Sequence, residues 1–460
     1  MVRGARGAIL LFMGPRVAVV GSGPAGLFAV EALLKQRAEA QVDVFERLPA
    51  PYGLLRYGVA PDHLKIKSLE AGFRKTLSDP RVRFFGNVEL GRDVHVEDLL
   101  ASYDAIVYAV GAPNDRRLGI AGEDLPGSLA STEFVRWYGG HPETKTSPVD
   151  LTRARSAAVI GVGNVAIDTV RLLLKDPALL HETDMPREII DALAASGIRE
   201  VSMLGRRGPH DAKFTTVELR ELGELPGVDV VVDPRDLAGV EAFELDGQTK
   251  RNLDVLREFS GRKPTGAPRR LNLRFYARPE AIGGTDAVES LLIERMAYDA
   301  DKKLHGTGVF EDLPVDLVFR AVGYKSIPFA GLPFDERAFV VPNEGGRVHN
   351  GSGTRHERQY VTGWVKRGPQ GVIGTNKKCA TETVTALLED IPAGETLGER
   401  PDIAAALSKR GVPFVDWDGW LRIEAREHEL GAAEGRKRIK IVDRDELLAA
   451  ANATAVPASP

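Results

Sequence analysis

The stretch that most constrains this chain is the glycine-rich turn Gly21-Ser22-Gly23-Pro24-Ala25-Gly26. An apolar run, 17–20, precedes the turn, and apolar residues at helical spacing follow it. Gly21 permits a tight turn, Gly23 lets backbone N–H groups approach a pyrophosphate, and Gly26 lets helix and strand pack closely. The next apolar run ends in Glu46, whose carboxylate can accept hydrogen bonds from ribose hydroxyls. Strand, turn, helix, strand and acid together predict a dinucleotide site, which on this motif alone could hold FAD or NAD.

A second glycine turn, Gly161-Val162-Gly163-Asn164-Val165-Ala166, follows the apolar run 157–160 and opens another predicted helix. Alanine in place of the third glycine is compatible with a Rossmann turn. The strand predicted after that helix ends in Arg206 and Arg207 rather than in an acid. Arginine, with its fixed fork of donors, suits the 2′-phosphate of NADP, whereas a carboxylate would repel it. We therefore expect NADP(H) here and FAD at the first turn, the alternative being a solvated basic pair.

Two buried strands end in the same tripeptide, Ala-Val-Gly, at 109–111 and at 321–323. We interpret them as two crossing points between domains, with the second nucleotide turn in an inserted domain. The expected fold is α/β with two Rossmann-like dinucleotide-binding domains, glutathione-reductase-like, the NADP-binding domain being inserted into the FAD-binding domain. The expected ranges are a flexible extension at 1–15, FAD-binding segments at 16–112 and 323–448, the NADP-binding domain at 113–322 and a disordered tail at 449–460.

Composition narrows the class of protein. The chain has 460 residues, of which 43% are hydrophobic and 27% charged, as in a globular protein of two or three domains. A net charge of -4 gives no reason to expect a nucleic-acid partner, and no apolar stretch is long enough to predict a membrane span. We favour a flexible extension over a vestigial targeting segment at the start and expect a cytoplasmic protein. The single cysteine, Cys379, excludes a CxxC redox pair.

A long loop follows Glu46 and ends at His63. Three prolines and two glycines shape the stretch 47–63, and long loops in compact domains are often functional. Because the loop leaves from the end of the ribose-binding strand, it can lie along the bound ligand. A lone histidine is ordinarily a surface or hydrogen-bonded core residue, but this position also fits a catalytic role for His63.

A third glycine-rich stretch, 360–376, precedes a predicted helix that includes 380–388. A helix N-terminus at Gly371-Val372-Ile373 could direct N–H groups toward an electron-rich flavin edge. Trp364 could stack on the cofactor or fill the core, and Cys379 is expected to be buried.

The segment 261–278 is basic and contains no acid. A solvated loop is the ordinary interpretation, and a docking face for an acidic protein partner is the sharper one. Its cations are Arg262, Lys263, Arg269, Arg270, Arg274 and Arg278.

Five stretches give the chain a resemblance to a known family. They are GSGPAG from Gly21, YGLLRYGVAPDH ending at His63, GVGNVAIDTVR from Gly161, GRRGPHDAKFTTVELREL from Gly205 and GWVKRGPQGVIGTN from Gly363. From residue 16 to about residue 448 the chain resembles the adrenodoxin-reductase-type ferredoxin–NADP+ reductases, including their bacterial members.

The resemblance implies roles for particular residues. Implied FAD contacts are Ala25, Glu46, Leu54, Leu90, Trp364, Gly371, Val372 and Ile373, with Gly371 also at the nicotinamide end. The implied pyrophosphate turn for NADP is Val162, Gly163, Asn164 and Val165, and the implied 2′-phosphate ligands are Arg206 and Arg207. Glu218 is implied near the nicotinamide, and His63 and Asp168 near the redox centre with proton-handling or coupling roles. Leu90 replaces a frequent valine. The basic segment does not align cleanly with the docking arginines of the animal enzymes, so the partner-binding residues stay open.

The two predicted sites suggest hydride transfer between NADPH and FAD, followed by single-electron transfer to an external ferredoxin-type iron–sulfur protein. The flavin is needed because nicotinamide delivers two electrons together, whereas a ferredoxin typically accepts one. Two alternatives stay open. One is a flavoprotein subunit feeding another enzyme, as glutamate synthase small subunits do, although their cysteine-rich N-terminal segments are absent here. The other is a non-catalytic NADPH sensor. The sequence leaves the ferredoxin, the direction of electron flow and the oligomeric state open, a monomer being compatible with it.

Overall fold

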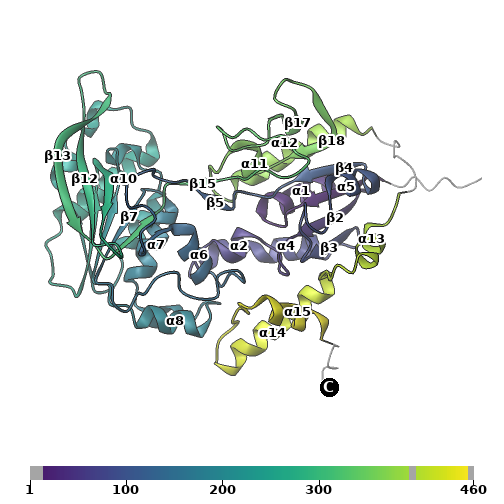
Figure 1. Ribbon diagram of the computed structural model, residues 1–460, viewed down its shortest axis with the longest axis horizontal. Coiled ribbons are helices and arrows are strands. Elements are labelled where there is room, and N and C mark those ends of the chain that lie inside the picture. The colour runs from purple at the N-terminus through teal and green to yellow at the C-terminus, as the bar shows by residue number, and fades with distance from the viewer. Residues whose placement is uncertain (1–13, 393–399, 454–460) are drawn as a thin grey trace, which may run out of the picture.

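The computed structural model describes residues 14–392 and 400–453, and its backbone forms two large, mainly parallel sheets flanked by helices (Figure 1). The first sheet has seven strands, of which β18, β4, β1, β2 and β3 run parallel. An antiparallel ribbon of β16 and β17 extends it beyond β18. In sheet order the strands are β16 (Asn343–Glu344), β17 (Arg347–His349), β18 (Arg355–Val361), β4 (Ala105–Tyr108), β1 (Arg16–Val20), β2 (Gln41–Glu46) and β3 (Val82–Gly86).

Apolar side chains cover both faces of the first sheet. Because successive strand residues point to opposite faces, β1 gives Val17 and Val19 to one core and Ala18 and Val20 to the other. The helices that pack on the first face include α1 (Pro24–Gln36) and α12 (Thr375–Asp390), and those on the second include α5 (Val96–Ser102) and α13 (Ile403–Lys409).

The second sheet has six strands, all parallel to their neighbours. In sheet order they are β6 (Ser128–Ala130), β14 (Leu317–Arg320), β7 (Ser156–Ile160), β8 (Glu200–Leu204), β10 (Arg269–Arg274) and β9 (Val228–Val232). One face packs against α6 (Ser131–Tyr138), α7 (Asn164–Leu174), α9 (Thr216–Leu222) and α10 (Gly247–Gly261).

A smaller antiparallel sheet covers the other face of the second sheet. It consists of β11 (Ala277–Gly283), β12 (Ser290–Tyr298) and β13 (Leu304–Pro314), drawn in green at the left of Figure 1. Leu291 and Ile293 from β12 pack with Ala158 and Ile160 from β7 in one buried cluster. The half predicted to bind NADP(H) therefore includes an antiparallel sheet that its Rossmann turn did not predict.

The two chain segments between the sheets pair with each other. β5 (Asn114–Asp115) and β15 (Tyr324–Lys325) form an antiparallel ribbon a few residues beyond Gly111 and Gly323. The first large sheet takes strands from both ends of the sequence, and the second takes strands only from between the crossings. This order agrees with an inserted domain, while the boundaries at 112/113 and 322/323 stay a prediction.

The remaining helices include α8, α14 and α15, which lie at the bottom of Figure 1, and α11, which lies beside α12. The C-terminal ones, in yellow in Figure 1, bring the buried Trp420 into the core of the first sheet. Within the described ranges, no helix is long and apolar enough to cross a bilayer. The bounds are α2 (Leu54–Tyr57), α3 (Leu64–Lys67), α4 (Leu69–Leu77), α8 (Arg187–Ala194), α11 (Trp364–Arg367), α14 (Trp417–Ala433) and α15 (Arg444–Asn452).

Two expectations about the chain ends need correction. The tail expected at 449–460 starts inside α15, where Ala451 packs into the core, and 454–460 lie outside the described residues. Of the extension expected at 1–15, Gly14 and Pro15 are buried, and the carbonyl of Pro15 accepts the N–H of Gln41. Residues 1–13 lie outside the described residues.

Candidate functional site

The first glycine turn leads from β1 directly into α1. Gly21 has φ +106°, and a Cβ there would lie 2.5 Å from the carbonyl oxygen of Ala109. A Cβ on Gly26 would lie 1.9 Å from the carbonyl oxygen of Gly21, so only glycine permits this approach of helix to strand. Gly23 is the N-cap of α1, whose first N–H groups and dipole suit a phosphate.

Glu46, at the end of β2, directs its carboxylate at this turn. Oε2 accepts the N–H of Ser22 at 3.1 Å and the Ser22 hydroxyl at 2.7 Å. Oε1 accepts the N–H of Leu48 at 3.2 Å. The acid predicted to bind ribose therefore lies beside the predicted pyrophosphate turn, as a dinucleotide site requires.

The third glycine-rich stretch meets the first turn in space. A Cβ on Gly363 would lie 2.5 Å from the Cβ of Ala25, and Trp364 packs against Tyr324 with ring centroids 5.1 Å apart. Leu54, 39% exposed at the start of α2, follows Gly53, whose backbone approaches Gly23. Leu90 is partly buried and packs against the core on the face of the first sheet opposite α1.

The helix expected at Gly371 starts later in the chain. α12 begins at Thr375, and Gly371 has φ +82° in the preceding loop. Val372 is 58% exposed, whereas Ile373 packs against the core. The predicted flavin-edge segment is therefore a loop that precedes a helix N-terminus.

The second glycine turn has the same form. Gly161 has φ +143°, and a Cβ there would lie 2.3 Å from the carbonyl oxygen of Ala321. Gly163 is the N-cap of α7, which begins at Asn164. The side chain of Asn164 accepts the N–H of Thr215 at 2.9 Å, and the carbonyl of Val162 accepts the N–H of Lys213 at 2.8 Å. The neighbouring Val165 packs against the main core of this half.

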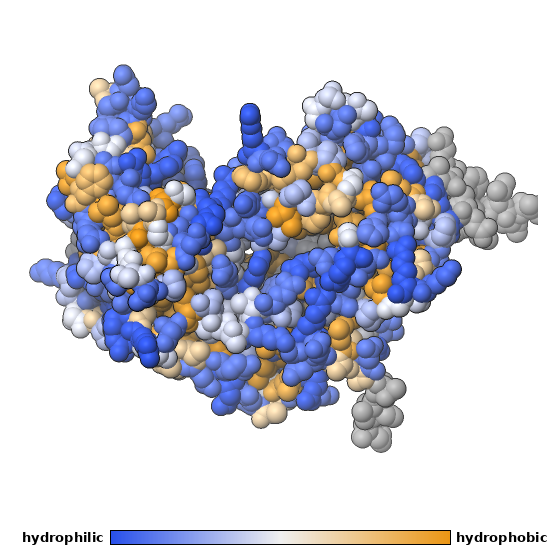
Figure 2. Space-filling model, viewed as in Figure 1, coloured by the Kyte–Doolittle hydropathy of each residue, from blue (hydrophilic) through white to orange (hydrophobic). Residues whose placement is uncertain are grey.

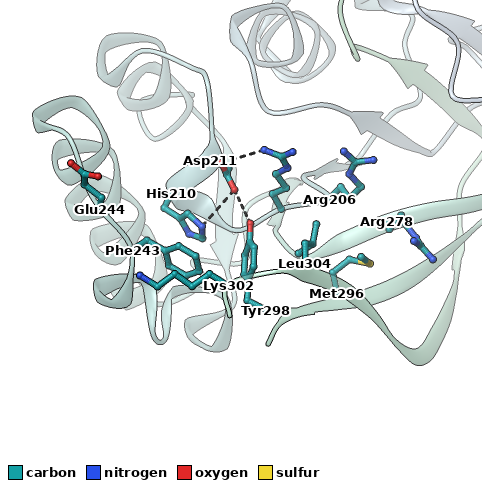
Figure 3. A pocket seen from close by; sticks show the side chains of 11 residues that line it. Arg206, His210, Asp211, Phe243, Glu244, Arg278, Met296, Tyr298, Lys302 and Leu304 are labelled. Carbon is teal, nitrogen blue, oxygen red and sulfur yellow. Dashed lines mark hydrogen bonds and ion pairs between the residues drawn. The ribbon is translucent and has the colours of Figure 1, made fainter. Parts of the chain in front are cut away.

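Arg206 and Arg207 line a pocket of about 650 Å³ at the end of β8 (Figure 3). Nη1 of Arg207 lies 3.5 Å from Asp211, and the Asp211 carboxylate also accepts the hydroxyl of Tyr298 at 2.7 Å. The antiparallel sheet thus helps to hold one of the two arginines predicted to read a 2′-phosphate. The other lining residues are His210, Phe243, Glu244, Arg278, Met296, Lys302 and Leu304.

Part of this pocket was not predicted from the sequence. The rings of His210 and Phe243 stack with centroids 3.8 Å apart, and Nζ of Lys302 lies 5.5 Å from the Phe243 centroid. His210 follows the two arginines closely, so its place could have been inferred. Phe243 and Lys302 come from segments with no local signal of a nucleotide site.

His63, Asp168 and Glu218 come together between the two sheets. Nε2 of His63 donates to Oδ1 of Asp168 at 2.8 Å and lies 3.3 Å from Oε2 of Glu218. Burial by itself would lower the pKa of His63, but hydrogen bonds to Asp168 and Glu218 raise it to about 10. The two carboxylates therefore favour the cationic imidazole near neutral pH, while Nη2 of Arg171, 2.7 Å from the same Nε2, opposes it.

Arg171, which the sequence did not single out, completes this cluster. It lies three residues past Asp168 on α7 and donates to the same Oδ1 at 2.7 Å. It also forms an ion pair with Asp62, to which Lys175 donates at 2.5 Å. Burial alone would raise the pKa of Asp62, but the charges of Arg171 and Lys175 lower it.

A metal ion does not fit this cluster well. Ligand atoms of His63, Glu218 and Glu221 lie within 4.8 Å of one another. Nη2 of Arg171, however, lies 2.7 Å from Nε2 of His63, so a guanidinium already supplies the positive charge there.

The space-filling view shows the surface hollowed between the two halves of the molecule (Figure 2).

The basic segment 261–278 is an exposed loop only in its first part, 262–268, which includes Arg262 and Lys263. Its next residues form β10, which lies between β8 and β9 inside the second sheet. Arg274 pairs with Glu311, and Arg278 pairs with Glu294. Glu311 on β13 and Glu294 on β12 neutralise these two side chains because the antiparallel sheet packs beside β10.

Comparisons with known proteins agree with this architecture. A family model described as pyridine nucleotide-disulphide oxidoreductase matches residues 15–184. The chain is 45% identical to NADPH-ferredoxin reductase FprA of Mycobacterium tuberculosis over 452 residues, which cover 94% of this chain and 98% of that relative. It is 38% identical to the mitochondrial NADPH:adrenodoxin oxidoreductase of Arabidopsis thaliana, with 95% of each chain covered.

A solved structure shows the same arrangement. The structure of Mycobacterium tuberculosis FprA in complex with NADPH matches with a TM-score of 0.89 and 43% identity, covering 95% of this chain and all of that one. Relatives this similar over nearly their whole length share a fold with two Rossmann-like domains. The chain is an oxidoreductase that belongs to the adrenodoxin-reductase-type family of ferredoxin–NADP+ reductases.

Proposed function

We propose that this chain is an FAD-dependent ferredoxin–NADP+ reductase. It transfers hydride between NADPH and FAD and passes electrons singly to a ferredoxin-type iron–sulfur protein. The observation that carries the proposal is the pairing of two glycine turns with opposite ribose ligands in one chain. Glu46 follows the first turn, and Arg206 and Arg207 follow the second. The names NADPH-ferredoxin reductase and NADPH:adrenodoxin oxidoreductase, carried by relatives, support the same reaction.

The residues at the first turn fit FAD. The N-terminus of α1 offers N–H groups to a pyrophosphate, and Gly23 leaves room for it. The Glu46 carboxylate, bonded to Ser22, can exchange that hydroxyl for ribose hydroxyls. Leu54 and Val372 expose apolar surface that a flavin ring system would cover. FAD supplies the conversion from two-electron hydride chemistry to single-electron transfer.

The second half fits NADP(H). The N-terminus of α7 can bind the pyrophosphate, with Val162 and Asn164 holding the 213–215 segment beside it. Arg206 and Arg207 supply planar donors for a 2′-phosphate at the mouth of the pocket. Both side chains are exposed, so a phosphate can reach them without displacing packed residues.

We assign His63, Asp168 and Glu218 to charge and proton handling at the redox centre. With its pKa raised to about 10, His63 is a proton donor rather than an acceptor near neutral pH. Asp168 orients the imidazole and is itself held by Arg171. This arrangement keeps a fixed positive charge between the two predicted nucleotide sites.

Disulfide chemistry within the chain does not fit, although the matching family model carries it in its description. The sequence contains one cysteine, and Cys379 is buried in α12 with its sulfur 3.3 Å from the N–H of Gly363. A dithiol relay needs two thiols. Electrons therefore leave the flavin toward an external acceptor.

Anaerobic turnover with a plant-type [2Fe–2S] ferredoxin tests the proposal. NADPH and catalytic amounts of the FAD-loaded protein should bleach the ferredoxin, and NADH should do so far more slowly. Flavin reduction by NADPH without ferredoxin bleaching would contradict the proposed acceptor and favour a subunit that feeds another enzyme. Absence of NADPH–ferricyanide turnover would favour a sensor.

A further inference from the structure

A buried lysine joins three segments that lie far apart in the sequence. The side chain of Lys440 has no exposed surface, and its Nζ donates to the carbonyls of Arg56 and Gly139 at 2.9 Å each. The Asp184 carboxylate lies 3.3 Å from the same Nζ. In its charged form this amine has three donors, each facing an acceptor, and burial lowers the pKa of Lys440 to about 7 although the Asp184 carboxylate favours the charged form. Arg56 belongs to the predicted FAD-binding half, while Gly139 and Asp184 belong to the predicted insert, 113–322.

Residues around Lys440 are hydrogen-bonded to the backbone of the predicted insert. The N–H of Lys440 donates to the carbonyl of Asp184 at 3.1 Å. Nη2 of Arg436 donates to the carbonyl of Thr183 at 2.7 Å. The segment 436–440 is therefore fastened along 183–185, beside α8.

The same segment is also fastened to the FAD-binding half. Glu427 on α14 is fully buried and accepts Nη1 of Arg56 at 3.2 Å and Nε of Arg438 at 2.8 Å. Its carboxylate also accepts the N–H of Ile441 at 3.0 Å. Segment 436–441, itself within the predicted FAD-binding range 323–448, is thus hydrogen-bonded both to the rest of that half and to the predicted insert.

Residues 56–63 form the last part of the loop 47–63. The insert contacts both ends of this part. At one end, a Cβ on Gly139 would lie 2.5 Å from the carbonyl oxygen of Tyr57, so the two backbones meet closely. At the other end, His63 contacts Asp168 on α7, and Asp62 forms an ion pair with Arg171. The stretch 56–63 is therefore the bridge between the halves, and Lys440 fixes its first end.

We propose that Lys440 is a positioning residue for hydride transfer, fixing the bridge 56–63 against Gly139 and Asp184 and so setting the placement of the two nucleotide sites. The inference rests on the proposed function. Displacements of about 1 Å remote from a reacting centre can cost about 100-fold in rate. A buried charge pair is often no more stabilising than an apolar one, so a lysine here is better explained by the geometry that it imposes.

The test compares Lys440→Met with Lys437→Met, a matched change on an exposed lysine of the same segment. Both are purified with FAD and checked for flavin content. Single-turnover flavin reduction is measured at saturating NADPH, and binding of 2′,5′-ADP, a ligand of the insert alone, is measured separately. Amide hydrogen exchange is followed at 56–63 and 139–141 in the absence of NADPH.

In Lys440→Met we expect the limiting reduction rate to fall at least 10-fold, with 2′,5′-ADP affinity within twofold of wild type. Hydrogen exchange should accelerate at both 56–63 and 139–141, and Lys437→Met should match wild type throughout. An unchanged limiting rate in FAD-loaded Lys440→Met would overturn the proposal, as would equal losses in rate and 2′,5′-ADP binding.

A milder variant covers failure of Lys440→Met to fold. Asp184→Asn keeps the shape but removes the charge opposite the ammonium, and it should show the same pattern to a smaller degree; wild-type rate and exchange would overturn the proposal. If wild type itself were not reduced by NADPH, the proposed function would fail, and the exchange measurement would still decide whether Lys440 fixes the bridge.

Discussion

Nε2 of His63 and Oδ1 of Asp168 lie 2.8 Å apart although 105 residues separate them in the chain. His63 ends the loop that follows β2 of the first sheet, and Asp168 lies on α7, which packs on the second. The contact therefore joins the two nucleotide-binding halves at the place where the chemistry is proposed. The pKa of His63 in this contact gives the first prediction.

The raised pKa of His63 predicts a pH-dependent contribution to stability. Because the folded-state pKa is about 10 and the ordinary value is 6.5, the contribution is fully present below pH 6.5 and is lost as the pH rises through about 10. The free energy of unfolding in urea should therefore differ between wild type and His63→Gln at pH 6, and the difference should shrink by pH 10.5. His305→Gln, on an exposed histidine, is the control. A difference that does not change with pH would contradict the assignment.

Arginine recognition of the 2′-phosphate predicts a coenzyme-specific loss. A hydrogen bond to a charged group contributes about 1.5–3 kcal/mol, so Arg206→Ala with Arg207→Ala should weaken NADPH binding by about 100-fold or more. Binding of NADH should change little. Arg235→Ala, on a side chain 85% exposed in the same half, should leave both affinities unchanged. The dissociation constants can be measured by flavin-fluorescence titration, and equal losses for the two coenzymes would refute the 2′-phosphate assignment.

A substitution at Gly163 should weaken NADPH binding without weakening the fold. The φ of Gly163 is -118°, which any residue can adopt. A Cβ placed on it would have no described heavy atom within 4 Å, apart from atoms of its neighbours along the chain and of the backbone of α7. Gly163→Ala should therefore leave the melting temperature within a few degrees, since a substitution to alanine at an N-cap costs about 1 kcal/mol. The added methyl group would instead occupy space needed by the pyrophosphate, and NADPH affinity should fall about 10-fold.

Gly72→Ala, on the exposed face of α4, is the matched control and should bind NADPH normally. If Gly163→Ala binds NADPH as tightly as wild type, the pyrophosphate does not approach this turn. Calorimetric melting and equilibrium titration on the same preparations distinguish the two effects.

The fold class could be predicted from the sequence because its signals are local. Gly21 and Gly161 each sit between an apolar strand and a helix, and their positive φ angles are what such turns require. The repeated Ala-Val-Gly strands predicted two crossings between domains, although not that β5 and β15, which follow them, would pair. The two glycine turns depend on residues within about ten positions of one another.

The site was less accessible because its contacts are remote in sequence. Asp168 and Glu218 were indicated only by the family resemblance, and nothing local pairs Arg171 with Asp62. The second part of the basic segment could not be read locally, because Glu294 and Glu311, which neutralise Arg278 and Arg274, come from strands later in the chain. Lys440 gave no signal at all, since its three acceptors lie in three distant segments. The catalytic and binding roles of the named residues stay predictions.

An anaerobic absorption spectrum tests the central claim most directly, namely that FAD and NADPH bind within reach of each other in one chain. The purified protein should show an oxidised flavin spectrum, which NADPH should bleach in one turnover and an added ferredoxin should then restore. Colourless protein that cannot be reconstituted with FAD, or a flavin spectrum that NADPH leaves unchanged, would contradict the account.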